Sequence, residues 1–209
     1  ALAELPGGRV VSASEDCCLR IWELRTVGLE RVQPQPFCLR TLEEHTDRVR
    51  CVAVLRDGRI VSGSRDDTLR VWDAATGECL RVLEGHADFV WCVAVLPDGL
   101  IVSGSKDCTL KLWNVEEGSC FKTLRTHSQT IRCVAALAGG GFVSGSNDDS
   151  LKVWNANYRC WRTLLGHRDG VLCVACFPDD RRVVSGAGDQ TRQAVSRIFL
   201  DGRRGARAG

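Results

Sequence analysis

The sequence predicts an all-β fold built from one repeated, four-stranded unit. Four His residues recur at intervals of 41, 41 and 40 residues: His45, His86, His127 and His167. Four Trp residues recur at intervals of 50, 41 and 41 residues: Trp22, Trp72, Trp113 and Trp154. Self-similarity at roughly 40 to 45 residues is typical of propeller blades, each of which is a four-stranded antiparallel sheet. The predicted fold is therefore a β-propeller, with about five blades visible in the 209 residues.

The unit that follows His86 shows its four strands most plainly. Residues 90–96 form a continuous apolar run, Pro97-Asp98-Gly99 is typical of a hairpin turn, and 100–105 form a second strand. A tight turn then leads to a third strand over 109–113, and a loop leads to a fourth over 120–124. The first strand is apolar on both faces, as expected where neighbouring blades cover both sides of a sheet.

The same pattern divides the chain into five units and a tail. The units span about 1–44, 45–85, 86–126, 127–166 and 167–190. The first unit begins inside its leading strand, so we expect the true N-terminus to lie upstream, and an insertion around 26–36 predicts an enlarged surface loop. The fifth unit loses its third-strand anchor, because Val195 stands one period after Trp154. Residues 191–209 therefore predict a degenerate strand followed by a basic, disordered tail.

Short motifs near the ends of the unit carry a family resemblance. A Gly-His pair stands early in the unit, at Gly85-His86 and Gly166-His167, and Trp72-Asp73 stands late in it. Looser forms of the late pair are Trp22-Glu23, Trp113-Asn114 and Trp154-Asn155. Through these motifs the chain resembles the WD40-repeat family over residues 1 to about 190. The resemblance implies a ring that is typically seven-bladed, so we expect this chain to be part of a longer propeller.

Charge and hydropathy argue against several classes of ligand. The chain has 28 Lys and Arg against 26 Asp and Glu, with the two signs interspersed, so nothing demands a nucleic acid partner. The longest apolar stretch, 89–96, is far shorter than the roughly 18 residues of a membrane span. We therefore expect no specific nucleic acid, no membrane, no small-molecule substrate and no cofactor.

The 12 Cys residues follow the repeat instead of occurring in pairs. One set stands six residues after each repeat His: Cys51, Cys92, Cys133 and Cys173. A second set stands seven residues before one: Cys38, Cys79, Cys120 and Cys160. Placement once per blade predicts structural thiols, and hence a reducing compartment such as the cytoplasm or nucleus. Cys173 and Cys176 form a C-x-x-C pair, but a single pair without His ligands is weak evidence for a metal, and we predict none.

Each complete unit contains a His, a Ser, an Asp and a Trp at fixed spacing. The sets are His45, Ser62, Asp66 and Trp72; His86, Ser103, Asp107 and Trp113; and His127, Ser144, Asp148 and Trp154. A hydrolase triad is one interpretation, but an enzyme needs one such site and this chain repeats it. A chain of hydrogen bonds from indole through hydroxyl and imidazole to carboxylate satisfies every polar group. It also resembles the structural tetrad of the WD40 family, so we predict that these sets are structural and that the protein is not an enzyme.

The resemblance also implies where partners dock. In the WD40 family they usually bind the face that carries the loops around the first strand and the turn before the tetrad Asp. The matching positions are the third and fifth residues after each His and the residue before each Asp. These predicted partner-binding residues are Arg48, Arg50, Arg65, Phe89, Trp91, Lys106, Thr130, Arg132 and Asn147. Arg and large aromatic residues are typical anchors of protein interfaces. The alternative is that Trp91 packs between blades and that the arginines are merely solvated.

Three motifs suggest a finer hypothesis about function. They are Val49-Arg50-Cys51-Val52, Ser62-Gly63-Ser64-Arg65-Asp66 and Ile131-Arg132-Cys133-Val134. They resemble the propellers of F-box ubiquitin-ligase substrate receptors, in which arginines at such positions grip phosphate groups of a degron peptide. The predicted function is thus a non-enzymatic scaffold that binds proteins or peptides, and recognition of phosphorylated peptides is the finer hypothesis. The alternatives are a purely architectural propeller inside a larger complex and a propeller-based hydrolase.

Overall fold

The computed structural model describes residues 1–23, 37–177, 182–189 and 192–195. Nineteen strands and no helix occur in these residues, so the predicted all-β class is confirmed. The strands form five separate antiparallel sheets in chain order, which we call blades 1 to 5. The loop expected around 26–36 and the tail expected after 195 lie outside the described residues.

Blades 1 to 4 have four strands each. Blade 1 contains β1 (Leu2–Leu5), β2 (Arg9–Ala13), β3 (Leu19–Glu23) and β4 (Phe37–Leu42). Blade 2 contains β5 (Val49–Val54), β6 (Ile60–Ser64), β7 (Leu69–Trp72) and β8 (Cys79–Leu83). Blade 3 contains β9 (Val90–Val95), β10 (Ile101–Ser105), β11 (Leu110–Asn114) and β12 (Ser119–Leu124). Blade 4 contains β13 (Ile131–Ala136), β14 (Phe142–Ser146), β15 (Leu151–Trp154) and β16 (Cys160–Leu164).

Blade 5 has three described strands, β17 (Val171–Cys176), β18 (Val183–Ala187) and β19 (Arg192–Val195). β19 is the strand expected to be degenerate, and it pairs with β18 from Gly186↔Arg192 to Val183↔Val195. Backbone hydrogen bonds alone can hold such a strand, because they do not require the missing Trp anchor. The sheet therefore continues past residue 190, where the sequence pattern becomes unrecognisable.

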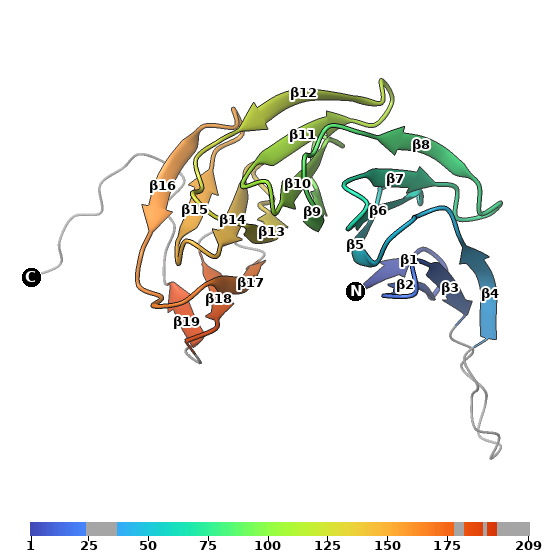
Figure 1. The fold of residues 1–209 in the computed structure, drawn as a ribbon, viewed down its shortest axis with the longest axis horizontal. Coiled ribbons are helices and arrows are strands. Elements are labelled where there is room, and N and C mark those ends of the chain that lie inside the picture. Colours follow the sequence, from blue (N-terminus) through green and yellow to red (C-terminus); the bar gives the residue numbers. More distant parts are fainter. Residues whose placement is uncertain (24–36, 178–181, 190–191, 196–209) are drawn as a thin grey trace, which may run out of the picture.

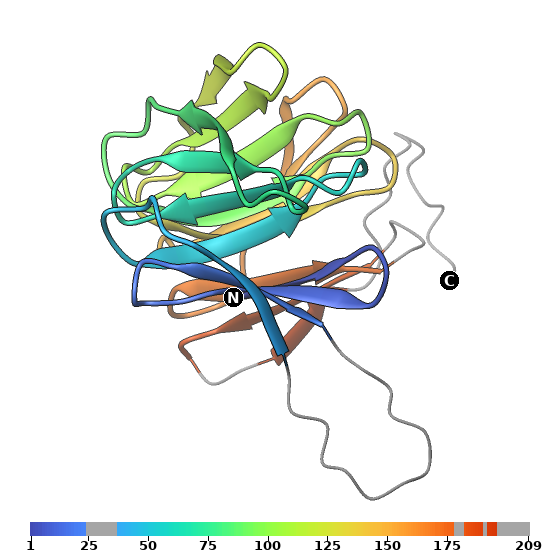
Figure 2. The same ribbon diagram turned by 90° about the vertical axis from the view of Figure 1, so that its right-hand side faces the viewer.

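The five blades form an open arc around a common axis (Figure 1). The first strand of each blade lies on the inside of the arc and packs against the next, so β1, β5, β9, β13 and β17 follow one another. The fourth strands β4, β8, β12 and β16 lie on the outside (Figure 1). Among the described strands no comparable packing joins β17 back to β1. Blades 1 and 5 thus form two ends that face each other across a gap, and Figure 2 shows them from the side.

Neighbouring blades interlock at a glycine of the second strand. A Cβ atom on Gly63 would lie 2.7 Å from Cγ1 of Val90, which belongs to the next blade. Gly104 and Gly145 receive the next blade in the same way, through a β-branched side chain each. At Gly186 of blade 5 the only nearby atom among the described residues is the sulfur of Cys173, at 2.9 Å. Because no further blade covers it in the described structure, Cys173 is exposed.

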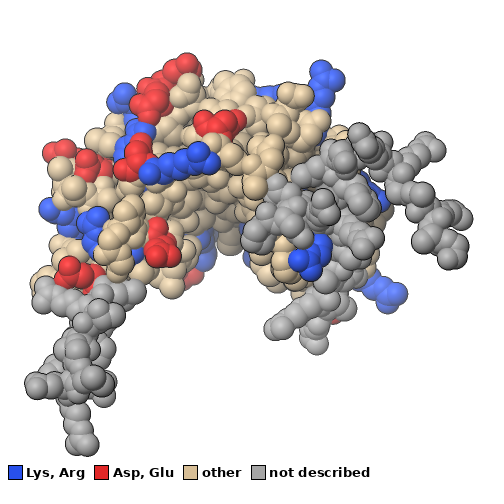
Figure 3. All heavy atoms as spheres, turned by 180° about the vertical axis from the view of Figure 1, so that it is seen from behind, with Lys and Arg blue, Asp and Glu red and all other residues tan. Residues whose placement is uncertain are grey.

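The surface carries both signs of charge. Seen from behind, the described Lys and Arg side chains alternate with Asp and Glu (Figure 3). This matches the interspersed charges of the sequence. None of the described residues belongs to a helix with the length and apolar character of a membrane span.

Candidate functional site

A β-bulge places one side chain per blade at the start of the inner strand. In blades 2 to 5 the pairing of the first two strands shifts by one residue, which leaves an extra residue on the first strand. These extra residues are Arg50, Trp91, Arg132 and Leu172. A bulge re-aims the side chain that it carries and often lies beside a functional site. In these blades the fifth residue after the His therefore lies outside the regular pairing of the first two strands.

A repeated backbone hydrogen bond brings the two other predicted positions together. The amide of Arg65 donates to the carbonyl of Arg48 at 3.0 Å. The same bond joins Lys106 to Phe89 at 2.9 Å. In blade 4 it joins Asn147 to Thr130, also at 2.9 Å. The third residue after each His and the residue before each Asp thus lie side by side in every one of these blades.

Across blades 2, 3 and 4, cationic side chains contact two aromatic rings. The guanidinium groups of Arg50 and Arg132 lie 5.0 and 4.0 Å from the ring centroid of Trp91. The guanidinium of Arg65 lies 4.2 Å from the ring centroid of Phe89, and the ammonium of Lys106 lies 4.6 Å from it. We call Arg50, Arg65, Phe89, Trp91, Lys106 and Arg132 the aromatic–cation cluster. Trp91 is half-buried, and its contacts with two neighbouring blades hold three blades in register at this face.

Some cations of this face already have carboxylate partners. Glu15 accepts hydrogen bonds from Arg48 at 3.0 Å and from Arg50 at 2.8 Å. Lys106 lies 3.2 Å from Asp88. In the described part of the chain, the guanidinium groups of Arg65 and Arg132 have neither an ion pair nor a hydrogen bond, and Nε of Arg65 is buried without an acceptor. The two arginines that are available to an anion are therefore Arg65 and Arg132.

Glu15 is a site residue that the sequence analysis missed. It stands in the turn of blade 1 that matches the turn of Arg65 in blade 2, because Ser14-Glu15-Asp16 aligns with Ser64-Arg65-Asp66. The rule that selects the residue before each Asp would have found it, had the rule been applied to the incomplete first unit. Its partner could not be read from the sequence, since Arg50 lies 35 residues away along the chain.

The repeated His, Ser, Asp and Trp residues form continuous hydrogen-bonded chains. In blade 2 the indole of Trp72 donates to Ser62 Oγ at 2.8 Å, and His45 lies 2.7 Å from both Ser62 Oγ and Asp66 Oδ2. The corresponding distances lie between 2.7 and 3.0 Å in blades 3 and 4. In blade 5, His167 lies 2.9 Å from Ser185 and 3.2 Å from Asp189.

The chemistry of the chain assigns its protons. An indole N–H can only donate, so the Ser oxygen accepts a hydrogen bond from it. The Ser hydroxyl in turn donates a hydrogen bond to Nε2 of the imidazole, and Nδ1–H donates to the carboxylate. Burial raises the pKa of Asp66, but hydrogen bonds from His45 and Thr68 outweigh it and hold the pKa well below its usual value. Burial lowers the pKa of His127, which favours the neutral imidazole that this arrangement requires.

The same geometry is unsuited to nucleophilic catalysis. Ser62, Ser103 and Ser144 have no exposed surface. A catalytic Ser must reach a substrate carbonyl beside an oxyanion hole. Each of these hydroxyls is instead enclosed between an indole and an imidazole.

None of the 12 cysteines forms a disulfide. The C-x-x-C pair diverges, because the sulfur of Cys173 lies 3.9 Å from the carbonyl of Gly186 while that of Cys176 lies 4.0 Å from the carbonyl of Ala135. Within the described ranges no group of three or more His, Cys, Asp or Glu side chains could hold a metal ion.

Comparison with known families identifies the repeat. The family model of the WD domain, G-beta repeat, matches residues 36–73, 77–114, 118–155 and 158–191, which is well over half of the chain. The chain belongs to the WD40 family. No curated protein matches it. WD40 repeats indicate a protein-interaction scaffold, and proteins of this family are typically non-enzymatic and bind other proteins or peptides.

The matched WD40 segments do not coincide with the blades. The segment 36–73 begins at the outer strand β4 of blade 1 and continues through β5, β6 and β7 of blade 2. Segments 77–114 and 118–155 are offset in the same way. Each sequence repeat therefore joins two neighbouring blades covalently.

Proposed function

We propose that this WD40 scaffold binds acidic peptides, including phosphorylated ones, at the aromatic–cation cluster. The observation that carries the proposal is the state of Arg65 and Arg132. Both guanidinium groups lie on aromatic rings, and neither has a carboxylate partner among the described residues. Together they offer two positive charges on the face where the family usually receives its partners.

Stacking on a ring suits an arginine for anion binding. The ring contact restrains the guanidinium plane and leaves its N–H edge free, so less side-chain entropy is lost when a ligand binds. That edge can bind two oxygens of a phosphate or a carboxylate at once. Phe89 and Trp91 offer apolar surface beside the charges, which suits a peptide whose acidic residue has an apolar neighbour.

The pair of Arg48 and Arg50 contributes differently. Glu15 already neutralises them, so a second anion must displace this carboxylate. A doubly charged phosphate competes better for that position than a carboxylate does. This favours a phosphopeptide with its phosphate near Arg50, and a degron of a ubiquitin-ligase substrate would be one such peptide. The free cysteines support a reducing compartment, the cytoplasm or nucleus, as the place of binding.

A peptide array tests this function. Each sequence is presented with Ser, phosphoserine or Asp at a central position, and the array is probed with the wild-type chain and with Arg65→Ala and Arg132→Ala. A charge-assisted hydrogen bond contributes about 1.5 to 3 kcal/mol, so each variant should lose about 10- to 150-fold in affinity for the acidic peptides.

Arg125→Ala is the matched control, because Arg125 is exposed beyond the end of β12 and lies outside the cluster. It should retain full binding. Equal retention of the Ser, phosphoserine and Asp peptides, or equal binding by all variants, would exclude the proposal and leave only the general role of a protein scaffold.

A further inference from the structure

One of the four bulge positions on the inner strands holds an aliphatic side chain instead of a cation or an aromatic ring. Arg50, Trp91 and Arg132 occupy this position in blades 2, 3 and 4, and Leu172 occupies it in blade 5. We call these four residues the bulge row. Its first three members are neighbours, since both arginines contact the ring of Trp91. Leu172 comes next, one blade beyond Arg132.

The junction between blades 4 and 5 is built like the two before it. In all three, the residue before the bulge residue fits against a glycine of the preceding blade, as Val90 does at Gly63. Val171 does so at Gly145, where a Cβ atom would lie 2.7 Å from Cγ1 of Val171. The inner strands β13 and β17 also pack together. Leu172 therefore continues the bulge row in the same register.

Within the described part of blade 5, no flanking side chain covers Leu172. In blades 2, 3 and 4 the two positions beside the bulge residue carry side chains, the pairs being Arg48 and Arg65, Phe89 and Lys106, and Thr130 and Asn147. Blade 5 has Gly170 and Gly188 there, joined by the same backbone hydrogen bond at 3.0 Å. Leu172 is 47% exposed, and the other three members of the bulge row are less exposed.

The two glycines allow polar side chains to approach closely. A Cβ atom on Gly170 would lie 2.8 Å from Oδ1 of Asn147, and one on Gly188 would lie 2.5 Å from Oδ2 of Asp169. The amide of Gly170 donates a hydrogen bond to Asp169 at 2.7 Å, which holds this carboxylate in place. A second acidic residue of a ligand is therefore repelled in blade 5, because it would meet a like charge. An uncharged, apolar residue suits the exposed Leu172.

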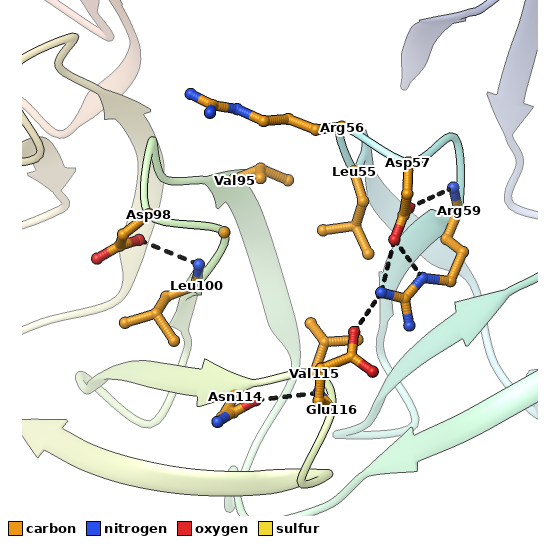
Figure 4. A pocket seen from close by; sticks show the side chains of 11 residues that line it. Leu55, Arg56, Asp57, Arg59, Val95, Asp98, Leu100, Asn114, Val115 and Glu116 are labelled. Carbon is orange, nitrogen blue, oxygen red and sulfur yellow. Dashed lines mark hydrogen bonds and ion pairs between the residues drawn. The ribbon is translucent and has the colours of Figure 1, made fainter.

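The hollow at the opposite end of blades 2 and 3 does not favour an acidic ligand. It has a volume of about 370 Å³. Three carboxylates and two guanidinium groups stand at its rim, those of Asp57, Asp98, Glu116, Arg56 and Arg59 (Figure 4). Because acidic groups outnumber basic ones there, an acidic peptide is repelled. The bulge row instead has an arginine without a carboxylate partner next to an exposed aliphatic side chain.

We propose that Leu172 determines specificity among the acidic peptides that the aromatic–cation cluster binds. This inference rests on the function proposed above. The acidic residue of the peptide binds Arg132, and an aliphatic residue within about three positions of it packs on Leu172 between Gly170 and Gly188. Three residues of an extended chain span roughly 10 Å, which is the usual separation of two stacked sheets. Since Leu172 lies on the blade 5 side of Arg132, the preference applies to one side of the acidic residue.

Fluorescence anisotropy with the complete 209-residue chain tests this specificity. The labelled reference peptide is Ser-Gly-Ser-phosphoserine-Ser-Gly-Ser. Six matched peptides place Leu at one of the three positions before or after the phosphoserine. Partial burial of the added Leu side chain should raise affinity by roughly 3- to 10-fold for a position on the blade 5 side. Leu172→Ser should remove this gain and leave the affinity of the reference peptide unchanged.

Two further variants sharpen the test. Leu172→Arg places a third arginine in the bulge row, so a gain from Glu should replace the gain from Leu at the same peptide position. Leu165→Ser is the matched control, because Leu165 is 80% exposed and lies outside the aromatic–cation cluster. It should retain every preference of the wild type. Because Leu172 is exposed, the melting temperatures of its two variants should match the wild type.

The outcomes separate this inference from the proposed function. The reference peptide reports on the function, since its binding should weaken in Arg132→Ala. If that holds but no Leu peptide gains affinity, or the gain survives in Leu172→Ser, the function stands and the role of Leu172 is wrong. If the reference peptide does not bind, or binds Arg132→Ala equally well, the proposed function is excluded and this inference fails with it.

Discussion

At the scale of single residues, the buried Ser hydroxyls show how the same residue types can serve structure or catalysis. Ser103 is enclosed, with its oxygen 2.8 Å from Nε1 of Trp113 and 2.7 Å from Nε2 of His86. Asp107 completes this chain at 2.8 Å from Nδ1 of His86. Because each polar group has its partner inside the blade, removal of one member leaves the next unsatisfied.

Asp107→Ala should therefore destabilise the chain without affecting any chemistry. The imidazole N–H of His86 would lose its acceptor in a buried position, which costs about 1 to 3 kcal/mol. Urea denaturation should detect this loss, while Glu117→Ala, at an exposed position, should leave the midpoint unchanged. Esterase or peptidase turnover that disappears in Ser103→Ala would contradict the structural role.

Titration of His127 and of the three Asp residues in these hydrogen-bonded chains should make stability depend on pH. The pKa of His127 is lowered in the folded state, mainly by burial, so the unfolded chain binds a proton more readily below its ordinary value of about 6.5. Stability should begin to fall below that pH. Asp66, Asp107 and Asp148 have lowered pKa values, so their contribution is present above about pH 4 and is lost on further acidification.

Melting temperatures measured at pH 7.5, 5.5 and 3.5 check this prediction. We expect a small decrease over the first step and a larger one over the second. A melting temperature that stays constant over the three values would show that these groups titrate alike in the folded and unfolded chains.

Glu15 should weaken the binding of acidic peptides at the aromatic–cation cluster. It accepts hydrogen bonds from Arg48 and Arg50, so Glu15→Gln removes a competing charge. Exposed ion pairs contribute about 0.2 to 1 kcal/mol, so affinity for an acidic peptide should rise by roughly 1.5- to 5-fold. Isothermal titration calorimetry would measure this change in affinity, with Glu117→Gln as the control. A decrease in affinity would indicate that Glu15 itself contacts the ligand.

The contacts of some of these residues could be predicted from the sequence, and those of others could not. The periods of His86 and Trp113 predict both the blade and the polar residues that meet inside it, because equal spacing places equal residues at equal positions. The contacts of Trp91 with Arg50 and Arg132 join three different blades. They could not be predicted, because the period of the sequence gives equivalent positions within a blade and not the contacts that side chains make between blades.

At the scale of the elements, a glycine in the second strand of blades 2, 3 and 4 determines how closely the next blade approaches. Gly104 leaves room for Ile131 of the next blade, and a Cβ there would lie 2.5 Å from Cγ2 of Ile131. The turn at Pro97-Asp98-Gly99 predicts that a strand follows in β10, but it does not reveal that this position must lack a side chain. The bulge at Trp91 was likewise hidden, because an extra residue in β9 leaves the apolar pattern intact.

Gly104→Ala and Gly186→Ala form a matched pair that isolates the contact between blades. In Gly104→Ala the new methyl group meets Ile131 and Cys92, and such overpacking typically costs about 1 to 3 kcal/mol. In Gly186→Ala the new methyl group meets, among the described residues, only the sulfur of Cys173. Thermal denaturation should show the larger loss for Gly104→Ala. Equal losses would mean that the glycine serves the strand itself and not the junction.

At the scale of the whole molecule, the described part of the arc places no further blade against the outer face of blade 5. The inner strands of blades 2 to 4 share one burial pattern, whereas Cys173 and Ala175 of β17 are exposed. In a stacked array each unit is stabilised mainly by its neighbours, so a terminal unit without a cover is the least stable. An uncovered apolar sheet face also tends to associate with other chains.

The isolated chain should therefore self-associate through blade 5. Ala175→Lys places a charge on the uncovered face and should reduce association, whereas Ala156→Lys, on an exposed turn of blade 4, should not. Sedimentation velocity over a range of protein concentrations would detect the difference. A wild-type chain that is monomeric at every concentration would show that the face is covered or too polar to associate.

The offset between sequence repeats and blades bears on how such a chain can grow. A duplicated segment such as 77–114 supplies the outer strand of one blade and three strands of the next. A copy inserted by unequal recombination is therefore joined to both of its neighbours. Its first strand completes the sheet of the preceding blade, and the first strand of the following segment completes the sheet of the new blade. Since the junctions that follow blades 2, 3 and 4 use the same pair of a glycine and a β-branched residue, a new blade inserted among them meets a matching surface in either neighbour. The gene can thus gain or lose blades in whole steps while every intermediate product keeps complete sheets.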